Sequence, residues 1–162
     1  MIRPLEARDK SAVMALIRET GFFTEPEEAV AEELIDISLD RPDQKDYIVV
    51  VSEDGGDRPD GFLIYGPTPL TEGTYDLYWM AVAPRMQGKG LGKEFVRWTE
   101  ERVKAAGGRM LLIETASQPK YEPTRRFYIG LGYREVARVP DFYKPGDDRI
   151  IYAKVFDRES SQ

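Results

Sequence analysis

The pattern of hydrophobic and polar positions along the chain alternates between helical and strand-like segments. Aromatic and β-branched runs predict strands at residues 1–7, 46–51, 62–65, 74–82, 109–115, 133–138 and 149–155. Apolar residues at helical spacing predict helices at residues 9–20, 24–37, 93–106 and 123–131. This mixed order of elements indicates the α+β (mixed α/β) fold class.

Capping residues mark the ends of the first two predicted helices. Asp9 can cap the first helix, and Gly21 can end it. Thr24 and Glu27 have the spacing of a capping box, which opens the second helix. The first helix carries Val13, Leu16, Ile17 and Thr20 on one side, and the second runs through Val30, Leu34 and Ile37.

The length of the chain fits one domain. A chain of 162 residues buries about two-thirds of its unfolded surface when it folds. We expect a single domain over residues 1–157, followed by a frayed C-terminal tail at 158–162. No apolar run is long enough to span a bilayer, and the N-terminus does not resemble a signal peptide, so we expect a cytoplasmic protein.

Composition and charge exclude several kinds of chemistry. The sequence contains no cysteine and no histidine, which removes thiolate nucleophiles, disulfides, cysteine metal sites and Ser-His-Asp triads. We therefore expect no bound metal. A net charge of −6 argues against nucleic-acid binding and mildly favours a cationic substrate.

The most informative motif is a glycine-rich turn between the predicted strand 74–82 and the helix that follows. It reads Gln87-Gly88-Lys89-Gly90-Leu91-Gly92. Glycines let a backbone approach a ligand closely, and the unpaired N–H groups of a first helical turn point toward an anion. The turn therefore predicts a site for a phosphate or pyrophosphate. The alternative is a glycine turn that only joins the strand to the helix.

Two common phosphate loops do not fit this spacing. A Walker loop built on Gly92 and Lys93 would need a glycine at Gln87 and a serine or threonine at Glu94. The third glycine of the dinucleotide fingerprint would fall at Lys93, whereas Gly92 comes one residue too early.

Two motifs together resemble the GNAT N-acetyltransferase superfamily. Gln87-x-x-Gly90-x-Gly92 after such a strand is similar to its acyl-CoA pyrophosphate motif. A later segment resembles its late helix, which commonly ends Phe-Tyr-x-x-x-Gly-Phe; here it reads Phe127-Tyr128-Ile129-Gly130-Leu131-Gly132-Tyr133. The resemblance covers nearly the whole chain. It implies a GNAT-like single domain, with a central, mostly antiparallel twisted sheet of about six or seven strands flanked by about four helices.

The resemblance implies acetyl-CoA as cosubstrate. The pyrophosphate would lie on the N–H groups of the glycine turn. The pantetheine arm would enter a gap between residues 80–82 and 113–115 and pair with their backbone. The alternative for Lys93 is an ordinary solvated lysine. The residues implied to bind acetyl-CoA are Met80, Ala81, Val82, Gln87, Gly88, Lys89, Gly90, Leu91, Gly92 and Lys93.

Tyr128 and Asp76 are the residues that the resemblance implies for catalysis. Tyr128 could protonate the leaving thiolate or hold its sulfur by a hydrogen bond; the alternative is a buried aromatic ring. Asp76 could be a general base, a counter-ion for the amine, or an aspartate at a strand edge without a catalytic role. Strict alternation along its strand would place Asp76 on one face, which should look into the cleft, with Tyr78, Met80 and Val82. The other, apolar face would belong to the core and contain Tyr75, Leu77, Trp79 and Ala81. Glu72 and Glu114 are weaker candidates for the base.

One position departs from the family pattern, and one loop has an open role. Many members carry an asparagine that contacts CoA seven residues before the tyrosine, where this chain has Tyr121. Residues 139–148 predict a turn-rich loop, which could border the acceptor pocket. For Asp147 and Asp148 we favour a plain surface turn.

The sequence thus predicts an N-acetyltransferase that moves an acetyl group from acetyl-CoA to a primary amine. The acceptor would be a small, cationic molecule, although a protein amine also fits, and a homodimer is compatible with the sequence. A non-catalytic acyl-CoA-binding sensor or regulatory module is the alternative. An unrelated nucleotide-phosphate binder is a third interpretation.

Overall fold

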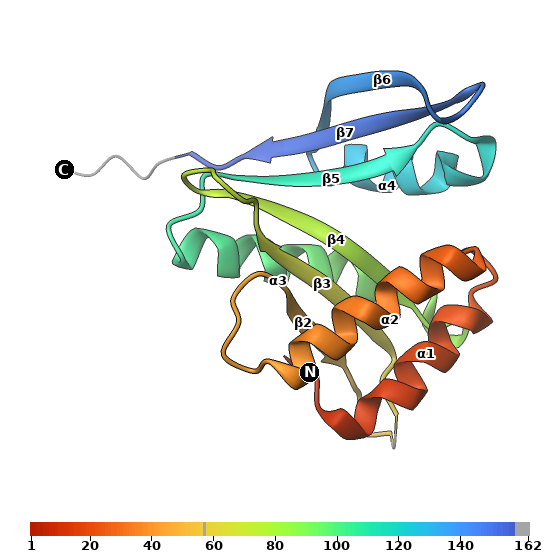
Figure 1. Cartoon of the computed structure of the whole chain (residues 1–162), viewed down its shortest axis with the longest axis vertical. Coiled ribbons are helices and arrows are strands. Elements are labelled where there is room, and N and C mark those ends of the chain that lie inside the picture. Colours follow the sequence, from red (N-terminus) through yellow and green to blue (C-terminus); the bar gives the residue numbers. More distant parts are fainter. Residues whose placement is uncertain (57, 158–162) are drawn as a thin grey trace. The chain divides into compact units, whose positions relative to one another are not determined.

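The structure is a computed structural model that describes residues 1–56 and 58–157; the expected tail at 158–162 lies outside these described residues. Within them the chain forms seven strands and four α-helices (Figure 1). The strands are β1 (Ile2–Pro4), β2 (Ile48–Ser52), β3 (Gly61–Pro67), β4 (Thr74–Val82), β5 (Met110–Ala116), β6 (Arg134–Lys144) and β7 (Asp147–Val155). The helices are α1 (Lys10–Glu19), α2 (Glu25–Asp40), α3 (Leu91–Ala105) and α4 (Glu122–Gly130), with 3₁₀ turns η1 (Ala7–Asp9), η2 (Pro84–Met86) and η3 (Pro119–Tyr121).

The strands follow the order β1-β2-β3-β4-β5-β7-β6 in one mixed sheet. The pairs β1/β2, β2/β3, β5/β7 and β6/β7 are antiparallel, and β4/β5 is parallel. The predicted α+β fold, with a mostly antiparallel sheet and four helices, is confirmed.

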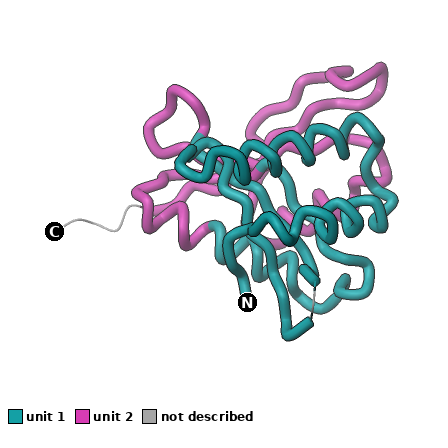
Figure 2. The backbone as a smooth tube through the Cα atoms, turned by 60° about the horizontal axis from the view of Figure 1, so that its bottom comes forward, with its two compact units in different colours: residues 1–67, 78–99 teal, residues 68–77, 100–162 magenta. Residues whose placement is uncertain are grey.

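The chain divides into two compact units, which we describe separately (Figure 2). Unit 1 contains residues 1–67 and 78–99, and unit 2 contains residues 68–77 and those from 100 onward. The single domain expected over residues 1–157 stays a prediction.

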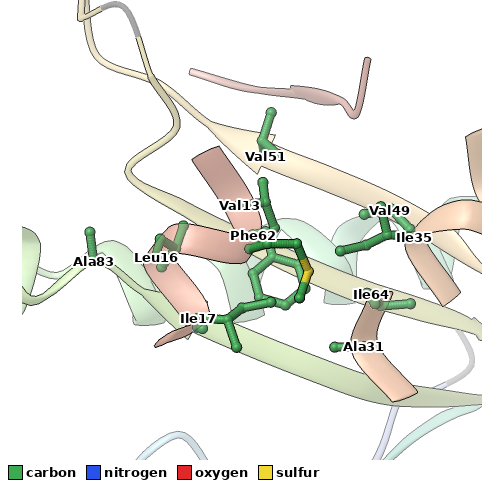
Figure 3. Close-up of a cluster of buried hydrophobic side chains, with 12 residues drawn as sticks. Val13, Leu16, Ile17, Ala31, Ile35, Val49, Val51, Phe62, Ile64 and Ala83 are labelled. Carbon is green, nitrogen blue, oxygen red and sulfur yellow. The ribbon is translucent and has the colours of Figure 1, made fainter. Parts of the chain in front are cut away.

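Unit 1 has helices on both faces of its strands. Phe62 and Ile64 of β3 belong to a buried cluster with residues of α1 and α2 (Figure 3). Tyr65 points to the opposite face, where its ring lies 6.1 Å from that of Trp98 in α3. Other members of the cluster are Val13, Leu16, Ile17, Ala31, Ile35, Val49 and Val51.

The start of α2 follows the prediction, and the structure shows which face of the helix is buried. The capping box is confirmed: Glu27 N donates to Thr24 Oγ1 (3.3 Å), and Thr24 N donates to Glu27 Oε1 (3.1 Å). The helix buries the stripe centred on Ala31 and Ile35, whereas Val30 is 47% exposed. Adjacent helical positions differ by about 100°, so the neighbour of a buried residue can face water.

Asp9 does not cap α1, contrary to the prediction. Its carboxylate accepts a hydrogen bond from Glu6 N (2.8 Å) and pairs with Arg3 through Nη1 (2.7 Å) and Nη2 (2.9 Å). Arg3 also contacts Glu53, so one guanidinium links the first strand, the turn before α1 and the end of β2. Gly21 ends α1 with φ +63°, as predicted.

Unit 2 contains β5, β7 and β6 with the first half of β4. The pairs between β4 and β5 run from Thr74–Met110 to Leu77–Ile113. The gap expected farther along these two strands stays a prediction.

The turn-rich loop predicted at residues 139–148 is wrong. β6 continues to Lys144 and β7 begins at Asp147, which leaves a tight turn that contains Gly146 with φ +82°. Pro140 lies within β6 because β6 ends the strand order, and an edge strand does not need every N–H for pairing. The register of β6 on β7 is irregular after Val139.

Candidate functional site

The glycine-rich turn of unit 1 joins η2 to α3. Gly88 and Gly90 have φ values of +80° and +85°, a left-handed conformation that favours glycine. A Cβ added at either position would meet no atom of the described residues within 4 Å. The backbone conformation, rather than protein packing, therefore requires these glycines.

The backbone N–H groups of this turn are unpaired. In the described part of the chain, none of the six N–H groups from residues 88–93 donates a hydrogen bond to a protein group. The flanking groups are paired: Gln87 N donates to Pro84 O (3.3 Å), and Glu94 N donates to Gly90 O (3.0 Å). A run of free N–H groups at a helix start is suited to bind an anion.

Two lysines lie in the same segment. Lys89 and Lys93 are exposed, and neither makes an ion pair within residues 1–56 and 58–157. Lys93 lies in the first turn of α3, where a cation is unfavourable unless an anion offsets it. An exposed, solvated lysine remains an alternative for both.

The base of the turn is fixed by an ion pair that the sequence did not reveal. Arg85 Nη2 donates to Asp60 Oδ1 (2.8 Å) and to Pro59 O (3.1 Å), while Ala83 N donates to Asp60 O (2.8 Å). Asp60 is only 9% exposed. The pair joins residues far apart in sequence, and its only local signal was an aspartate in the turn-rich segment 54–61.

The end of β4 departs from strict alternation. Ala81 is buried in the core cluster, and Met80 and Val82 are half-buried. Tyr78 and Trp79, which are neighbours in the chain, both pack against that same cluster. The expectation that Tyr78 lies on the face opposite Trp79 and Ala81 is therefore wrong.

Tyr128 lies on α4 in unit 2. It is 5% exposed, and its ring lies 5.1 Å from Phe127 and 6.0 Å from Tyr133, each in an edge-on arrangement. Burial raises the pKa of its phenol above the ordinary value. Its hydroxyl makes no hydrogen bond to any described residue. Aromatic packing explains the ring but leaves the hydroxyl without a partner among the described residues.

Asp76 is half-buried in β4. Thr68 Oγ1 donates to Asp76 Oδ2 (2.6 Å), which fixes the orientation of the carboxylate. Glu72 is exposed, and its backbone carbonyl accepts a hydrogen bond from Arg109 Nε (2.7 Å). The roles of base and counter-ion stay open for Asp76.

The charge of Glu114 is already paired. Glu114 Oε2 accepts a hydrogen bond from the Tyr143 hydroxyl (2.7 Å), and its other oxygen pairs with Arg149. Partial burial and, after it, the hydrogen bond to Glu114 raise the pKa of the Tyr143 phenol. Because this carboxylate already accepts a hydrogen bond and forms an ion pair, it is a weaker candidate for a general base.

The surface-turn interpretation of Asp147 is wrong. Asp147 is 3% exposed, and its Oδ2 accepts a hydrogen bond from Gln118 Nε2 (2.6 Å). Asp148 accepts hydrogen bonds from Asp141 N and Arg138 Nη1, both at 2.9 Å. These partners are Gln118, which directly precedes η3, and residues of β6, so the sequence pattern around the aspartates did not reveal them.

Metal clusters, membrane-spanning helices and surface hollows can be stated for the described residues. No group of three or more His, Cys, Asp or Glu there could hold a metal ion. No described helix is both long enough and apolar enough to cross a membrane. A surface hollow of about 360 Å³ is lined by α2, including Glu32, Glu33, Asp36 and Asp40, and by none of the glycine-turn residues.

Comparison with known families identifies the class of protein. Residues 11–133 match the model of the Acetyltransferase (GNAT) family. The match covers most of the chain, and the chain belongs to this family. A search among curated protein sequences found no significant match.

Solved structures agree with this assignment. A Desulfovibrio desulfuricans protein described as a GNAT-family acetyltransferase is 43% identical, with a TM-score of 0.90 over 96% of this chain and 98% of that one. An aminoglycoside 6'-N-acetyltransferase in complex with coenzyme A has 20% identity and a TM-score of 0.75, over 99% of both chains. The Escherichia coli ribosomal-protein-S18-alanine N-acetyltransferase has 20% identity and a TM-score of 0.74, over 100% of this chain and 98% of that one. The last two structures, at 20% identity, show only that the fold is shared.

Proposed function

We propose that this protein transfers an acetyl group from acetyl-CoA to a primary amine by direct attack in a ternary complex. The observation that carries the proposal is the run of unpaired N–H groups at residues 88–93, which suits a pyrophosphate. Membership of the acetyltransferase family supports acyl transfer. The coenzyme A complex of the aminoglycoside enzyme supports this carrier, although that enzyme is only 20% identical.

The reaction needs one bond to form and one to break. The amine nitrogen attacks the thioester carbonyl carbon, the new C–N bond forms, and the C–S bond breaks to release the CoA thiolate. The sequence has no cysteine, so an acyl-thioester intermediate on the protein is not available. The amine must also lose a proton, for which Asp76 is the candidate acceptor, directly or through water.

Tyr128 is the proposed partner of the leaving sulfur. Burial raises the pKa of its phenol, whereas a thiol such as cysteine has an ordinary pKa of about 8.5. The proton is therefore held more tightly by the phenol than by the thiolate. This favours stabilisation of the thiolate by a hydrogen bond over full proton transfer.

Substitution of Tyr128 tests this role. Tyr128→Phe removes one hydroxyl and keeps the ring. A hydrogen bond to a charged group contributes about 1.5–3 kcal/mol, so we expect kcat to fall roughly 10- to 100-fold. A general acid would cost about 10²–10⁴-fold. Acetyl-CoA affinity should not change, and full activity in the variant would support the packing interpretation.

The decisive experiment measures CoA release from acetyl-CoA with a broad panel of amines. We expect turnover with a positively charged acceptor, such as a polyamine, an aminoglycoside or a basic amino acid. Tight acetyl-CoA binding without turnover on any amine would favour the sensor or regulatory module. Displacement of CoA by ATP at comparable concentration would favour a general nucleotide-phosphate binder. A cytoplasmic location remains part of the proposal.

A further inference from the structure

A buried polar network in unit 2 lies beside Tyr128. Glu100 of α3 is 7% exposed, and its Oε2 accepts a buried hydrogen bond from the Tyr133 hydroxyl (2.7 Å). Lys154 Nζ of β7 donates to both Glu100 oxygens at 3.2 Å. The same ammonium donates to Leu131 O (3.0 Å), just after the end of α4.

Packing alone does not explain this network. Burial of a carboxylate and partial burial of an ammonium remove their hydration, which costs free energy. A protein in which apolar residues of similar volume replace such a pair is often equally stable or more stable. Glu100 stands one helical turn from Val103, which is fully buried, so α3 carries a charge on an apolar face. Tyr133 stands where the family motif commonly ends in phenylalanine. Burial and the bond to Glu100 raise the pKa of Tyr133, so its phenol stays a neutral donor.

The network is tied directly to the last turn of α4. Tyr133 N donates to Tyr128 O (3.1 Å), and the two rings lie 6.0 Å apart at 72°. Between them, Gly132 reverses the chain with φ +96°. The backbone after Tyr128 is thus held by Lys154 through a carbonyl and by Tyr133 through an amide and a ring.

We propose that Tyr133, Glu100 and Lys154 position the hydroxyl of Tyr128 for its contact with the leaving thiolate. The inference rests on the proposed role of Tyr128. The three are positioning residues that act through Tyr128 and not on the substrate. A tyrosine held by a rigid network keeps its hydroxyl in the productive place, and a displacement of about 1 Å can cost about 10²-fold in rate.

Tyr133→Phe tests the proposal with the loss of a single hydroxyl. The ring that packs on Tyr128 stays, and Glu100 keeps Lys154. We expect kcat to fall about tenfold or more, with the KM for acetyl-CoA unchanged. In a Tyr128→Phe background the same change should alter kcat by less than about twofold, because no hydroxyl is left to position.

Controls separate positioning from stability. Ile35→Val in unit 1 removes one buried methylene and should lower the melting temperature without changing kcat. If Tyr133→Phe is unstable, Glu100→Gln keeps the volume and an oxygen acceptor for Tyr133 but removes the charge that pairs with Lys154. It should cause a smaller loss of kcat, again only where Tyr128 is present.

Three results would overturn the inference. The first is wild-type kcat in folded Tyr133→Phe while Tyr128→Phe is impaired, which leaves the proposed function intact. The second is an equal loss of kcat from Tyr133→Phe with and without the Tyr128 hydroxyl. Full activity of Tyr128→Phe would remove the role of Tyr128 itself and the inference with it.

Discussion

Gly90 offers a sharp test of the glycine turn. Its φ of +85° costs a non-glycine residue roughly 1–2 kcal/mol, against a usual stability of about 5–15 kcal/mol. A Cβ there meets no described atom within 4 Å, so Gly90→Glu should fold. The variant places both bulk and negative charge where we expect the pyrophosphate.

The loss of affinity can be estimated from the charge alone. Two unit charges about 4 Å apart near a protein surface repel by about 4 kcal/mol. Since about 1.4 kcal/mol corresponds to a tenfold change, the dissociation constant for acetyl-CoA should rise about 10³-fold. Displacement of the ligand from the unpaired N–H groups adds to this loss.

Isothermal titration calorimetry with acetyl-CoA measures the effect, and two variants serve as controls. Gly90→Gln has nearly the same bulk without charge and should bind with intermediate affinity. Gly21→Glu is matched in backbone, because Gly21 has φ +63° and open space around it, but it ends α1. It should lose similar stability and keep its acetyl-CoA affinity. Added salt should narrow the difference between the Glu and Gln variants of Gly90.

Unchanged acetyl-CoA affinity in folded Gly90→Glu would refute the assignment of the pyrophosphate to this turn. An equal loss in Gly21→Glu would show that destabilisation, rather than contact with the ligand, causes the weaker binding.

Two further predictions concern carboxylates. Asp76→Asn keeps the shape that accepts the Thr68 hydrogen bond but removes the charge, so steady-state kinetics should show weaker acceptor use and little change in acetyl-CoA binding. For the wild type, kcat/KM for the acceptor should rise with pH and fall with ionic strength. The prediction would be contradicted if the preferred acceptor were anionic or neutral, or if Asp76→Asn left the acceptor kinetics unchanged. The Arg3 guanidinium holds the pKa of Asp9 below its ordinary value of about 3.9, so Asp9 stabilises the fold above that pH and loses its contribution as the pH falls further. Asp9→Asn should therefore lower the free energy of unfolding by about 3 kcal/mol at pH 7. Urea titrations should show that the difference in the free energy of unfolding between Asp9→Asn and the wild type is smaller near pH 3 than at pH 7. A difference that does not change with pH would count against the ion pair.

The sequence by itself determined the features that depend on neighbouring residues. β4 has the predicted bounds of 74–82, because alternation and aromatic content are local signals. The capping box at Thr24 and the positive φ angles of Gly88 and Gly90 follow from the same kind of signal. The turn expected to hold the pyrophosphate was therefore readable from a few consecutive residues.

The tertiary structure alone decided which side chains find partners. Glu100 meets Tyr133 and Lys154 across 33 and 54 residues of sequence, and no local pattern reveals such a contact. Asp147 is in a turn-like sequence, yet it is buried and accepts a hydrogen bond from Gln118, which directly precedes η3. Pro140 favoured a loop in the sequence, but β6 contains it because β6 is an edge strand, the last in the strand order. Local signals set backbone conformation, whereas burial and pairing depend on elements that only folding brings together.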